Sequence, residues 1–274
     1  MKQLILLICF PLQVVCQNTI GFPDIINYPK QSYKAGLQNW DIKQDKNGIV
    51  YFANNEGLLS FDGKYWNNHP LPNKTNVRSV EIGPANRIYV GGQDELGYFA
   101  PAANGRLLYY SLIEQIAAKD RSFGDVWDIV AFKGNIYFRS PKKIFKFTDR
   151  AVAVFNAPSE WDFLGECNGK LFAHDYAAGL LVFENDIWAP VFTENILPVN
   201  DPVTGIISIQ KDSAIITTLK NGLFLLSDTR IAVLPSVNNQ LFKNERVYAA
   251  TSINKDWIAL ATNNSGIYIT DLRG

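Results

Sequence analysis

Hydrophobic and polar residues follow one repeated order along most of this chain of 274 residues. Each unit has a short apolar run, a tight polar turn, a second run that ends in aromatic or small residues, and a third apolar run. The residues that precede the third run are Gly57, Gly97, Lys143, Gly179, Gly222 and Gly266. They recur at intervals of roughly forty residues, and three or four short strands per unit of that length are typical of propeller blades. The sequence therefore predicts an all-β fold, a β-propeller.

The first repeat shows the local signals most clearly. Its turn is Asp45-Lys46-Asn47-Gly48, and Asp, Asn and Gly are the residues that a tight hairpin favours. The next run, residues 49–53, is β-branched and aromatic, as expected of a central strand. A second turn ends at Gly57, and residues 58–61 form the third run. An outer strand then begins near Trp66.

Six blade cores are expected, and the last one is short. They lie near residues 39–72, 77–110, 126–158, 161–194, 203–236 and 247–274. The sixth repeat stops directly after its third run, whereas propellers close their ring and so remove free sheet edges. We therefore expect an incomplete ring, with residues 17–274 forming the front part of a longer protein or a fragment of one. The alternative is a compact six-blade ring that residues 20–28 close.

The N-terminus predicts an export signal. Lys2 supplies a positive start, residues 4–10 form a short apolar stretch, and Val14 and Cys16 occupy the positions before a cleavage site at Gln17. That stretch is too short to span a bilayer. We expect residues 1–16 to be a signal peptide and the mature chain to be exported to the periplasm. Lipidation of Cys16 is the alternative.

Charge and cysteine content limit the possible partners. Lys and Arg together number 26, as do Asp and Glu, so no net field attracts this segment to nucleic acid. Beyond the signal peptide only Cys167 remains, which excludes an internal disulfide. The sequence offers no nucleic-acid partner for this segment and leaves a homodimer open.

Catalytic and metal-binding patterns are not evident in the sequence. His69 and His174 have no histidine or cysteine partner at a metal-ligand spacing, and Cys167 has no local nucleophile signature. Asp45 and Asn47 imitate the start of a calcium loop, but the later acidic ligands are absent. We therefore expect no catalytic residue, no metal site and no cofactor.

Tryptophans mark a candidate ligand site. Three similar triplets, Trp40-Asp41-Ile42, Trp127-Asp128-Ile129 and Trp161-Asp162-Phe163, stand at the entry to the innermost strand of their repeats, and Arg78 aligns with this place in the second repeat. Innermost strands line the central channel, so Trp40, Arg78, Trp127 and Trp161 are predicted to surround one channel mouth. Aromatic faces beside carboxylates suit a planar, polyhydroxy or otherwise amphipathic ligand. The alternative is that these tryptophans pack between adjacent blades.

The first two repeats also resemble a known family. The carrying segments are residues 21–66, 70–80 and 87–101, and the pattern residues are Gly48, Tyr51, Phe52, Asn54, Gly57, Leu58, Leu59, Phe61, Asp62 and Gly63. This stretch resembles the N-terminal sensor region of Bacteroidetes two-component regulator propeller proteins, most closely the branch with a triple-tyrosine β-sandwich module. The resemblance is specific over residues 37–101 and only repeat-like beyond them.

The resemblance implies a periplasmic sensor that binds an unknown small molecule or glycan. In such proteins a β-sandwich, one transmembrane helix and a LuxR-type helix-turn-helix or histidine kinase output follow the propeller. These downstream parts would belong to a full-length signal-transduction or transcription regulator, and this segment itself is expected to be non-catalytic. The alternative is an exported propeller enzyme, a polysaccharide lyase or glycosidase, and fold alone does not separate the two classes.

Overall fold

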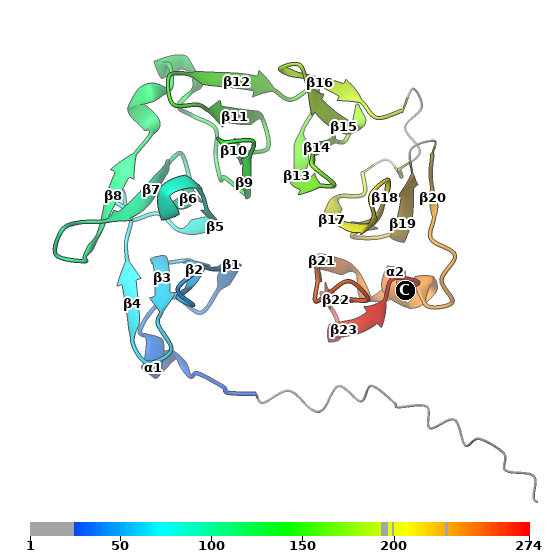
Figure 1. The fold of residues 1–274 in the computed structure, drawn as a ribbon, viewed down its shortest axis with the longest axis horizontal. Helices are drawn as coiled ribbons and strands as arrows, with labels where there is room; N and C mark the ends of the chain where they lie inside the picture. Colours follow the sequence, from blue (N-terminus) through cyan, green and yellow to red (C-terminus); the bar gives the residue numbers. More distant parts are fainter. Residues whose placement is uncertain (1–24, 193–196, 199, 228–229) are drawn as a thin grey trace, which may run out of the picture.

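The computed structural model describes residues 25–192, 197–198, 200–227 and 230–274, and in it six antiparallel sheets surround one axis as the blades of a β-propeller (Figure 1). The expected signal peptide, residues 1–16, lies outside the described residues. Within each sheet the strands follow one another in chain order from the centre outward, as the repeat pattern predicts. The predicted all-β propeller is confirmed.

The first three blades each have four strands. Blade 1 contains β1 (Asn39–Gln44), β2 (Val50–Asn54), β3 (Gly57–Phe61) and β4 (Trp66–His69). Blade 2 contains β5 (Val77–Ile82), β6 (Ile88–Gly92), β7 (Leu96–Pro101) and β8 (Leu107–Ser111). Blade 3 contains β9 (Asp128–Phe132), β10 (Asn135–Arg139), β11 (Lys143–Phe147) and β12 (Val152–Asn156).

The sixth blade differs from the fourth and fifth in having three strands. Blade 4 contains β13 (Trp161–Cys167), β14 (Lys170–Asp175), β15 (Gly179–Glu184) and β16 (Ile187–Pro190). Blade 5 contains β17 (Val203–Gln210), β18 (Ser213–Thr218), β19 (Gly222–Ser227) and β20 (Ile231–Val233). Blade 6 contains β21 (Val247–Ser252), β22 (Trp257–Thr262) and β23 (Gly266–Asp271).

Helical segments are short and peripheral. They are α1 (Lys30–Tyr33), α2 (Asn239–Glu245) and 3-10 turns at Pro84–Asn86, Ile113–Gln115 and Ala118–Asp120. The last two turns occupy the stretch between the second and third repeats, where the polar and apolar pattern leaves room for a helical turn. Among the described residues, no helix has both the length and the apolar character needed to cross a bilayer.

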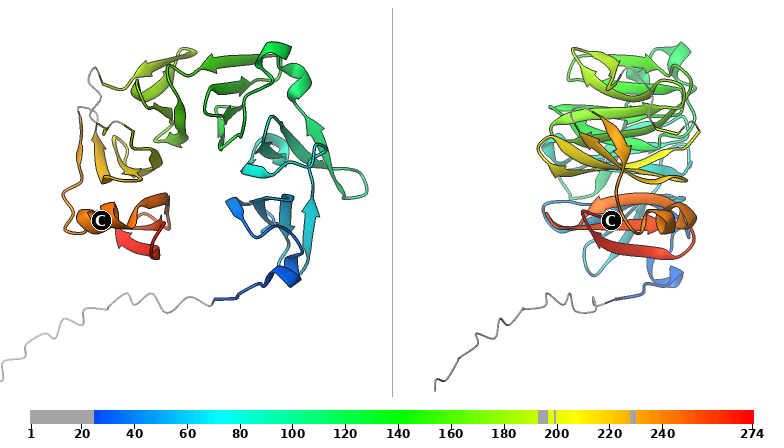
Figure 2. Two further views of the ribbon diagram at one scale, coloured as in Figure 1. Left: turned by 180° about the vertical axis from the view of Figure 1, so that it is seen from behind. Right: turned by 90° about the vertical axis from the view of Figure 1, so that its right-hand side faces the viewer.

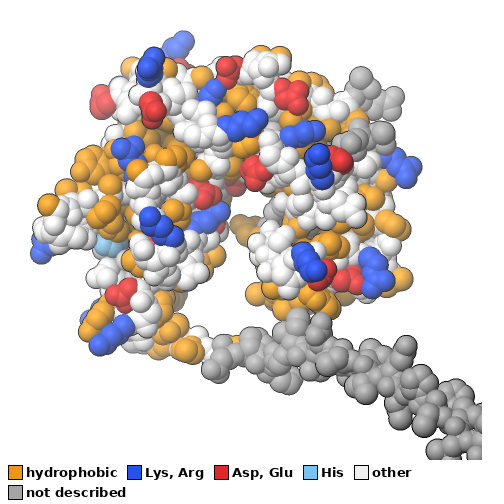
Figure 3. Space-filling model, viewed as in Figure 1, with side chains coloured by type: hydrophobic (Ala, Val, Ile, Leu, Met, Phe, Trp, Pro, Cys, Tyr) orange, Lys and Arg blue, Asp and Glu red, His pale blue; other side chains and the backbone are white. Residues whose placement is uncertain are grey.

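The ring is open between blades 1 and 6. Inner strands β1, β5, β9, β13, β17 and β21 pack in succession around the centre, and the first and sixth sheets stand apart (Figures 1 and 2). The space-filling view shows a central hollow that continues between these two sheets (Figure 3). The alternative closure by residues 20–28 is not seen in its described part: residues 25–28 form no strand, and the Tyr28 ring contacts Phe61 and Trp66 of blade 1.

The recurrent glycine before the third strand has a steric origin in blade 1. Gly57 adopts a φ of 134°, which disfavours L side chains, and a Cβ there would lie 2.5 Å from the carbonyl oxygen of His69. Any side chain at this position would therefore push β3 away from β4. The glycine that marks the repeat in the sequence is the residue that allows the outer strand to approach.

A polar side chain on each of the first five inner strands bonds to the backbone of the next inner strand or, for Ser79, of Val126 just before that strand. These five joints are Asp41 Oδ2 accepting from Val80 N (3.0 Å), Ser79 Oγ donating to Val126 O (2.7 Å), Asp128 Oδ2 accepting from Leu164 N (2.9 Å), Asp162 Oδ2 accepting from Val203 N (3.0 Å) and Thr204 Oγ1 donating to Val247 O (3.0 Å). An inner strand has no sheet neighbour on its channel side, so these bonds satisfy backbone groups that would otherwise lack a protein partner. The joints fix the height and angle of each blade against the next.

The joint between blades 4 and 5 includes a buried histidine beside its carboxylate. Asp162 Oδ1 lies 2.6 Å from His174 Nδ1, and the two side chains are 6% and 2% exposed. The same carboxylate accepts the Val203 N–H. His174 therefore holds the joint carboxylate in place.

Replacement of this carboxylate tests the joint. Asp162→Ala should lower the free energy of unfolding by about 3–5 kcal/mol, because the buried His174 ring and the Val203 N–H both lose their partner. Asp186→Ala is the control: Asp186 is an exposed carboxylate paired with Lys146, and its loss should cost less than about 1 kcal/mol. Urea denaturation measures both, and equal losses would contradict the joint's importance.

Candidate functional site

A bulge at the start of the inner strands decides which side chains reach the channel mouth. In blades 1 and 2 the pairing between the first and second strands skips one residue, Trp40 in β1 and Arg78 in β5. In blade 3 the regular pairing starts at Asp128, and Trp127 directly precedes it, its N–H bonded to Arg139 O. Since a bulged residue is left outside the sheet register, its side chain turns out of the blade face. The structure thus places Trp40, Arg78 and Trp127 at equivalent positions.

These three side chains contact one another. The Arg78 guanidinium carbon lies 4.2 Å from the ring centroid of Trp40 and 5.1 Å from that of Trp127. The two indole rings meet edge to face with centroids 5.7 Å apart. Trp40 Nε1 donates to Asn55 Oδ1 at 2.7 Å, which fixes that ring. The two indoles therefore hold the arginine in one orientation through cation–π contact.

Arg78 and its carboxylate partner keep unused hydrogen-bonding atoms. Arg78 Nε donates to Asp125 Oδ2 at 3.3 Å, and the side chains are 16% and 23% exposed. Among the described residues, the two terminal nitrogens of Arg78 have no hydrogen-bond partner, and Asp125 Oδ1 is buried without one. The free donors of Arg78 thus lie at the mouth, whereas the unpartnered Asp125 oxygen is buried behind them, and the pair adds little net charge.

The expected fourth member, Trp161, does not belong to this group. In blade 4 the pairing skips Asp162 rather than Trp161, so Asp162 takes the position equivalent to Trp40 and Arg78. Trp161 is 2% exposed, and its ring lies 5.8 Å from that of Trp188 within the core between blades 3 and 4. A shift of one residue along a strand turns a side chain to the other face. A stacking role for Trp161 is therefore corrected to a packing role.

The channel behind the mouth is large, and most of its charged groups are already paired. Its volume is about 850 Å³, and its wall includes Trp40, Arg78 and Trp127. Lys43 Nζ lies 2.9 Å from Glu81, and Arg139 Nε lies 2.6 Å from Asp128. These bonds hold the wall carboxylates in structural roles, so the mouth, with the unused donors of Arg78, is the chemically available part.

Asp41 directly follows Trp40 in the sequence. Burial raises its pKa above the usual aspartate value, although Lys43 and the N–H groups of Val80 and Ile42 act in the opposite direction. Its two oxygens bond to those N–H groups, at 3.0 Å for Val80 and 2.8 Å for Ile42. Asp41 therefore serves the blade joint and is not available to orient a ligand hydroxyl.

Sequence reasoning missed Asp125 and Tyr248. Asp125 directly precedes Val126-Trp127. The available signal was that this acidic residue stands at the entry to the inner strand of blade 3, while Arg78 stands at the entry to the inner strand of blade 2. Tyr248 occupies the bulge position of blade 6 and is half exposed on the channel wall. A one-residue bulge leaves no mark in hydrophobic alternation, so its position could not be read from the sequence.

Within the described residues, no group of three or more His, Cys, Asp or Glu side chains could hold a metal ion.

Comparison with known proteins places the fold beside sensor ectodomains. No protein-family model and no curated protein matches the sequence. Among solved structures, the extracellular domain of a putative one-component system from B. thetaiotaomicron matches with a TM-score of 0.66 and 15% identity, over 88% of this chain and 33% of that one. A second structure of that same protein, BT4673, described as a putative hybrid two-component system, matches with a TM-score of 0.66 and 15% identity, over 87% of this chain and 32% of that one. The chain thus spans about a third of these neighbours.

An enzyme shares the architecture to a similar degree. Virginiamycin B lyase from Staphylococcus aureus, in a catalytically inactive form with quinupristin, matches with a TM-score of 0.63 and 15% identity, over 90% of this chain and 87% of that one. At such identities the likeness concerns the fold alone. Because sensor domains and a lyase share it, the function must be argued from the site.

Two tryptophan variants should separate packing from mouth positions. Trp161→Ala should lower the free energy of unfolding by about 3–5 kcal/mol, because it leaves a large cavity between blades 3 and 4. Trp40→Ala should cost only about 1–2 kcal/mol, since Trp40 is half-buried and loses contacts with Arg78, Trp127 and Asn55 without leaving a closed cavity. Chemical denaturation monitored by circular dichroism measures both. Equal losses would show that Trp40 carries as much packing as Trp161.

Proposed function

We propose that this chain is the sensing part of an exported regulator and binds a small polyhydroxy ligand at the channel mouth without transforming it. The observation that carries the proposal is the Arg78 guanidinium, held against Trp40 and Trp127 with two terminal nitrogens that have no hydrogen-bond partner among the described residues. A sugar hydroxyl accepts hydrogen bonds, so vicinal hydroxyls would take the free N–H groups of Arg78. The exposed indole surface of Trp40 and Trp127 would contact the sugar ring.

The sensor role is supported by two features outside the site. The structural neighbours named above include extracellular domains of putative signalling systems, and the first repeats resemble regulator propellers. We infer that an output module of a longer protein receives the binding signal, with a β-sandwich and a membrane helix between them. The expected signal peptide would deliver residues 17–274 to the periplasm.

The alternative, a polysaccharide lyase or glycosidase, has less support from the site. Glycoside cleavage by the common routes needs a pair of free carboxyl groups, one as acid and one as base or nucleophile. Around this channel Asp41, Asp128 and Asp162 each bond to a backbone N–H of the next blade, and Asp128 also pairs with Arg139. Binding is therefore the function that the arrangement favours.

Isothermal titration with mannotriose, xylotriose, N-acetylchitotriose and trigalacturonate tests the proposal. For a saccharide that binds, Arg78→Ala and Trp127→Ala should each weaken binding by about 1–3 kcal/mol, the range for losing a central contact. Arg87→Ala is the matched control, because Arg87 also covers an aromatic ring, Tyr98 at 4.6 Å, away from the channel. Equal effects of Arg87→Ala and Arg78→Ala would contradict the site.

The same mixtures distinguish binding from turnover. After incubation with the wild-type chain, we expect each saccharide to be recovered unchanged. New reducing ends or unsaturated products that depend on the protein would overturn the non-catalytic assignment and support the enzyme alternative.

A further inference from the structure

The second and third strands of each blade set how tightly it meets the next blade. At one equivalent register position the second strand presents a large residue to the following blade, paired directly with a third-strand residue. From blade 1 to blade 5 these pairs are Tyr51–Ser60, Tyr89–Tyr98, Tyr137–Lys146, Phe172–Val182 and Ile215–Leu225. The third-strand member lies on the same face as its partner, where the two blades diverge toward the outside.

Because the blades diverge, a wedge-shaped space lies between each blade and the next, here called a wedge. The size of the third-strand residue decides whether this wedge is filled. Tyr98 fills the wedge beside blade 2 with its ring 5.4 Å from Tyr89, and Lys146 reaches from blade 3 over Phe183 of blade 4. Ser60 and Val182 are small. Beside these two residues, cavities of about 600 Å³ and 320 Å³ remain open.

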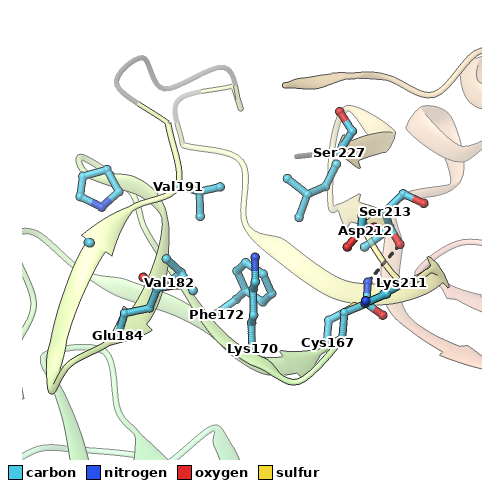
Figure 4. Close-up of a pocket in the computed structure, with 15 residues that line it drawn as sticks. Cys167, Lys170, Phe172, Val182, Glu184, Val191, Lys211, Asp212, Ser213 and Ser227 are labelled. Atoms are coloured by element: carbon cyan, nitrogen blue, oxygen red, sulfur yellow. Dashed lines mark hydrogen bonds between the residues drawn. The ribbon is translucent and has the colours of Figure 1, made fainter. Parts of the chain in front are cut away.

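Both open wedges are lined by polar and apolar groups together. In the wedge between blades 1 and 2, the polar groups include Ser60 and His69, whose Oγ and Nε2 lie 3.1 Å apart. The wedge between blades 4 and 5 has an apolar floor (Figure 4). Its floor residues are Cys167, Phe172, Val182, Ala214 and Leu226, of which all but Val182 are less than 9% exposed.

Hydrogen bonds hold one rim of the apolar wedge in shape. Asn168, in the hairpin turn of blade 4, donates from Nδ2 to Gln210 O at 2.9 Å and to Ser213 O at 3.3 Å in blade 5. These bonds join the two blades beside the cavity and do not cross it. The cavity is therefore a formed feature of the interface, of a volume that small-ligand sites have.

One cation stands over this apolar floor. Figure 4 shows the Lys170 side chain beside Phe172, with its amino group directed into the cavity, whereas Glu184 lies at the edge. Among the described residues Lys170 has neither an ion pair nor a side-chain hydrogen-bond partner. Lys211 on the opposite rim is likewise unpaired, as are Glu184 and Asp212, so the rim is nearly neutral overall. Selectivity for charge would come from the group that points inward, Lys170.

We propose that the wedge between blades 4 and 5 is a second ligand site, which takes a small monocarboxylate with an apolar aliphatic or aromatic body. The body would replace water on the floor formed by Phe172, Val182 and Leu226, where burial of apolar surface favours binding. The carboxylate would pair with the Lys170 ammonium in a charge-assisted hydrogen bond. This site lies between blades, away from Arg78, and does not depend on the function of the channel mouth.

Two probes with the same phenylpropyl body test the proposal: 4-phenylbutanoate, which ends in a carboxylate, and 4-phenylbutan-1-ol, which ends in a neutral hydroxyl. Each is titrated into the full chain, and binding is followed by saturation-transfer NMR. The carboxylate should bind roughly tenfold more tightly than the alcohol, as a charged hydrogen bond implies. Lys170→Gln should remove that difference. Equal affinities of the two probes for the wild-type chain would overturn the proposed charge selectivity.

Variants that introduce a tyrosine, as at Tyr98 of blade 2, show in which wedge the two probes bind. Val182→Tyr introduces the residue that fills the equivalent wedge as Tyr98, and it should abolish binding of both probes. Ser60→Tyr, the matched control, fills the other open wedge and should leave both affinities unchanged. Circular dichroism and thermal melting check that each variant folds. Retained binding in a folded Val182→Tyr variant, or loss in Ser60→Tyr, would overturn the assignment.

The rate of Cys167 alkylation tests whether the cavity is occupied in the wild-type chain, without any variant. Its side chain is 4% exposed in the wall of the cavity, and burial raises the pKa of the thiol to about 11, so alkylation by iodoacetamide should be slow at pH 8. Saturating 4-phenylbutanoate should slow it at least about threefold further, since a ligand that fills the cavity covers the sulfur. An unchanged rate at saturation would contradict occupancy of this wedge.

Discussion

The hydrogen bond from one inner strand to the backbone of the next is the interaction on which this propeller depends. It occurs at all five junctions between consecutive blades, through Asp41, Ser79, Asp128, Asp162 and Thr204. The chemistry varies, since carboxylates accept from N–H groups and hydroxyls donate to carbonyls. The geometric result is the same: each inner strand is fixed to its neighbour at one height, close to the channel.

That constraint also shapes the candidate ligand site. Asp41 and Asp128 are committed to the joints, and the residues directly before them, Trp40 at the bulge of β1 and Trp127 just before β9, lie at the channel mouth. Arg78 occupies the same position in the blade between them and lies against both rings. The mouth therefore combines rigid aromatic surface with an arginine that Asp125 holds and whose remaining donors are unused. At the start of β1, Asp41 serves the blade joint and the adjacent Trp40 lines the candidate site.

Toward the outside the blades diverge, and the joints no longer determine the packing. There the side chain on the third strand decides whether two blades close against each other, as at Tyr98 and Lys146, or leave a cavity, as at Ser60 and Val182. A propeller can thus vary its lateral surfaces by single substitutions without changing the ring. In this chain the two cavities have different lining residues.

The sequence by itself determined the six repeats, their strand order and the approximate position of every blade, because period-two alternation and turn residues are local properties. It also placed Trp40, Arg78 and Trp127 at one mouth, since equivalent positions in a propeller must come together. Only the tertiary structure decided the role of Trp161. A bulge shifted by one residue gave the channel position to Asp162 and buried the indole against Trp188.

The pairing of Arg78 with Asp125 and the open wedge beside Val182 depended on tertiary structure for the same reason. Both arise from contacts between residues of neighbouring blades, about forty positions or more apart, and hydrophobic alternation within one strand carries no information about a neighbour's side-chain size or charge. Local patterning specifies which elements form. The distances between their side chains are set only when bulges and joints fix how the blades pack.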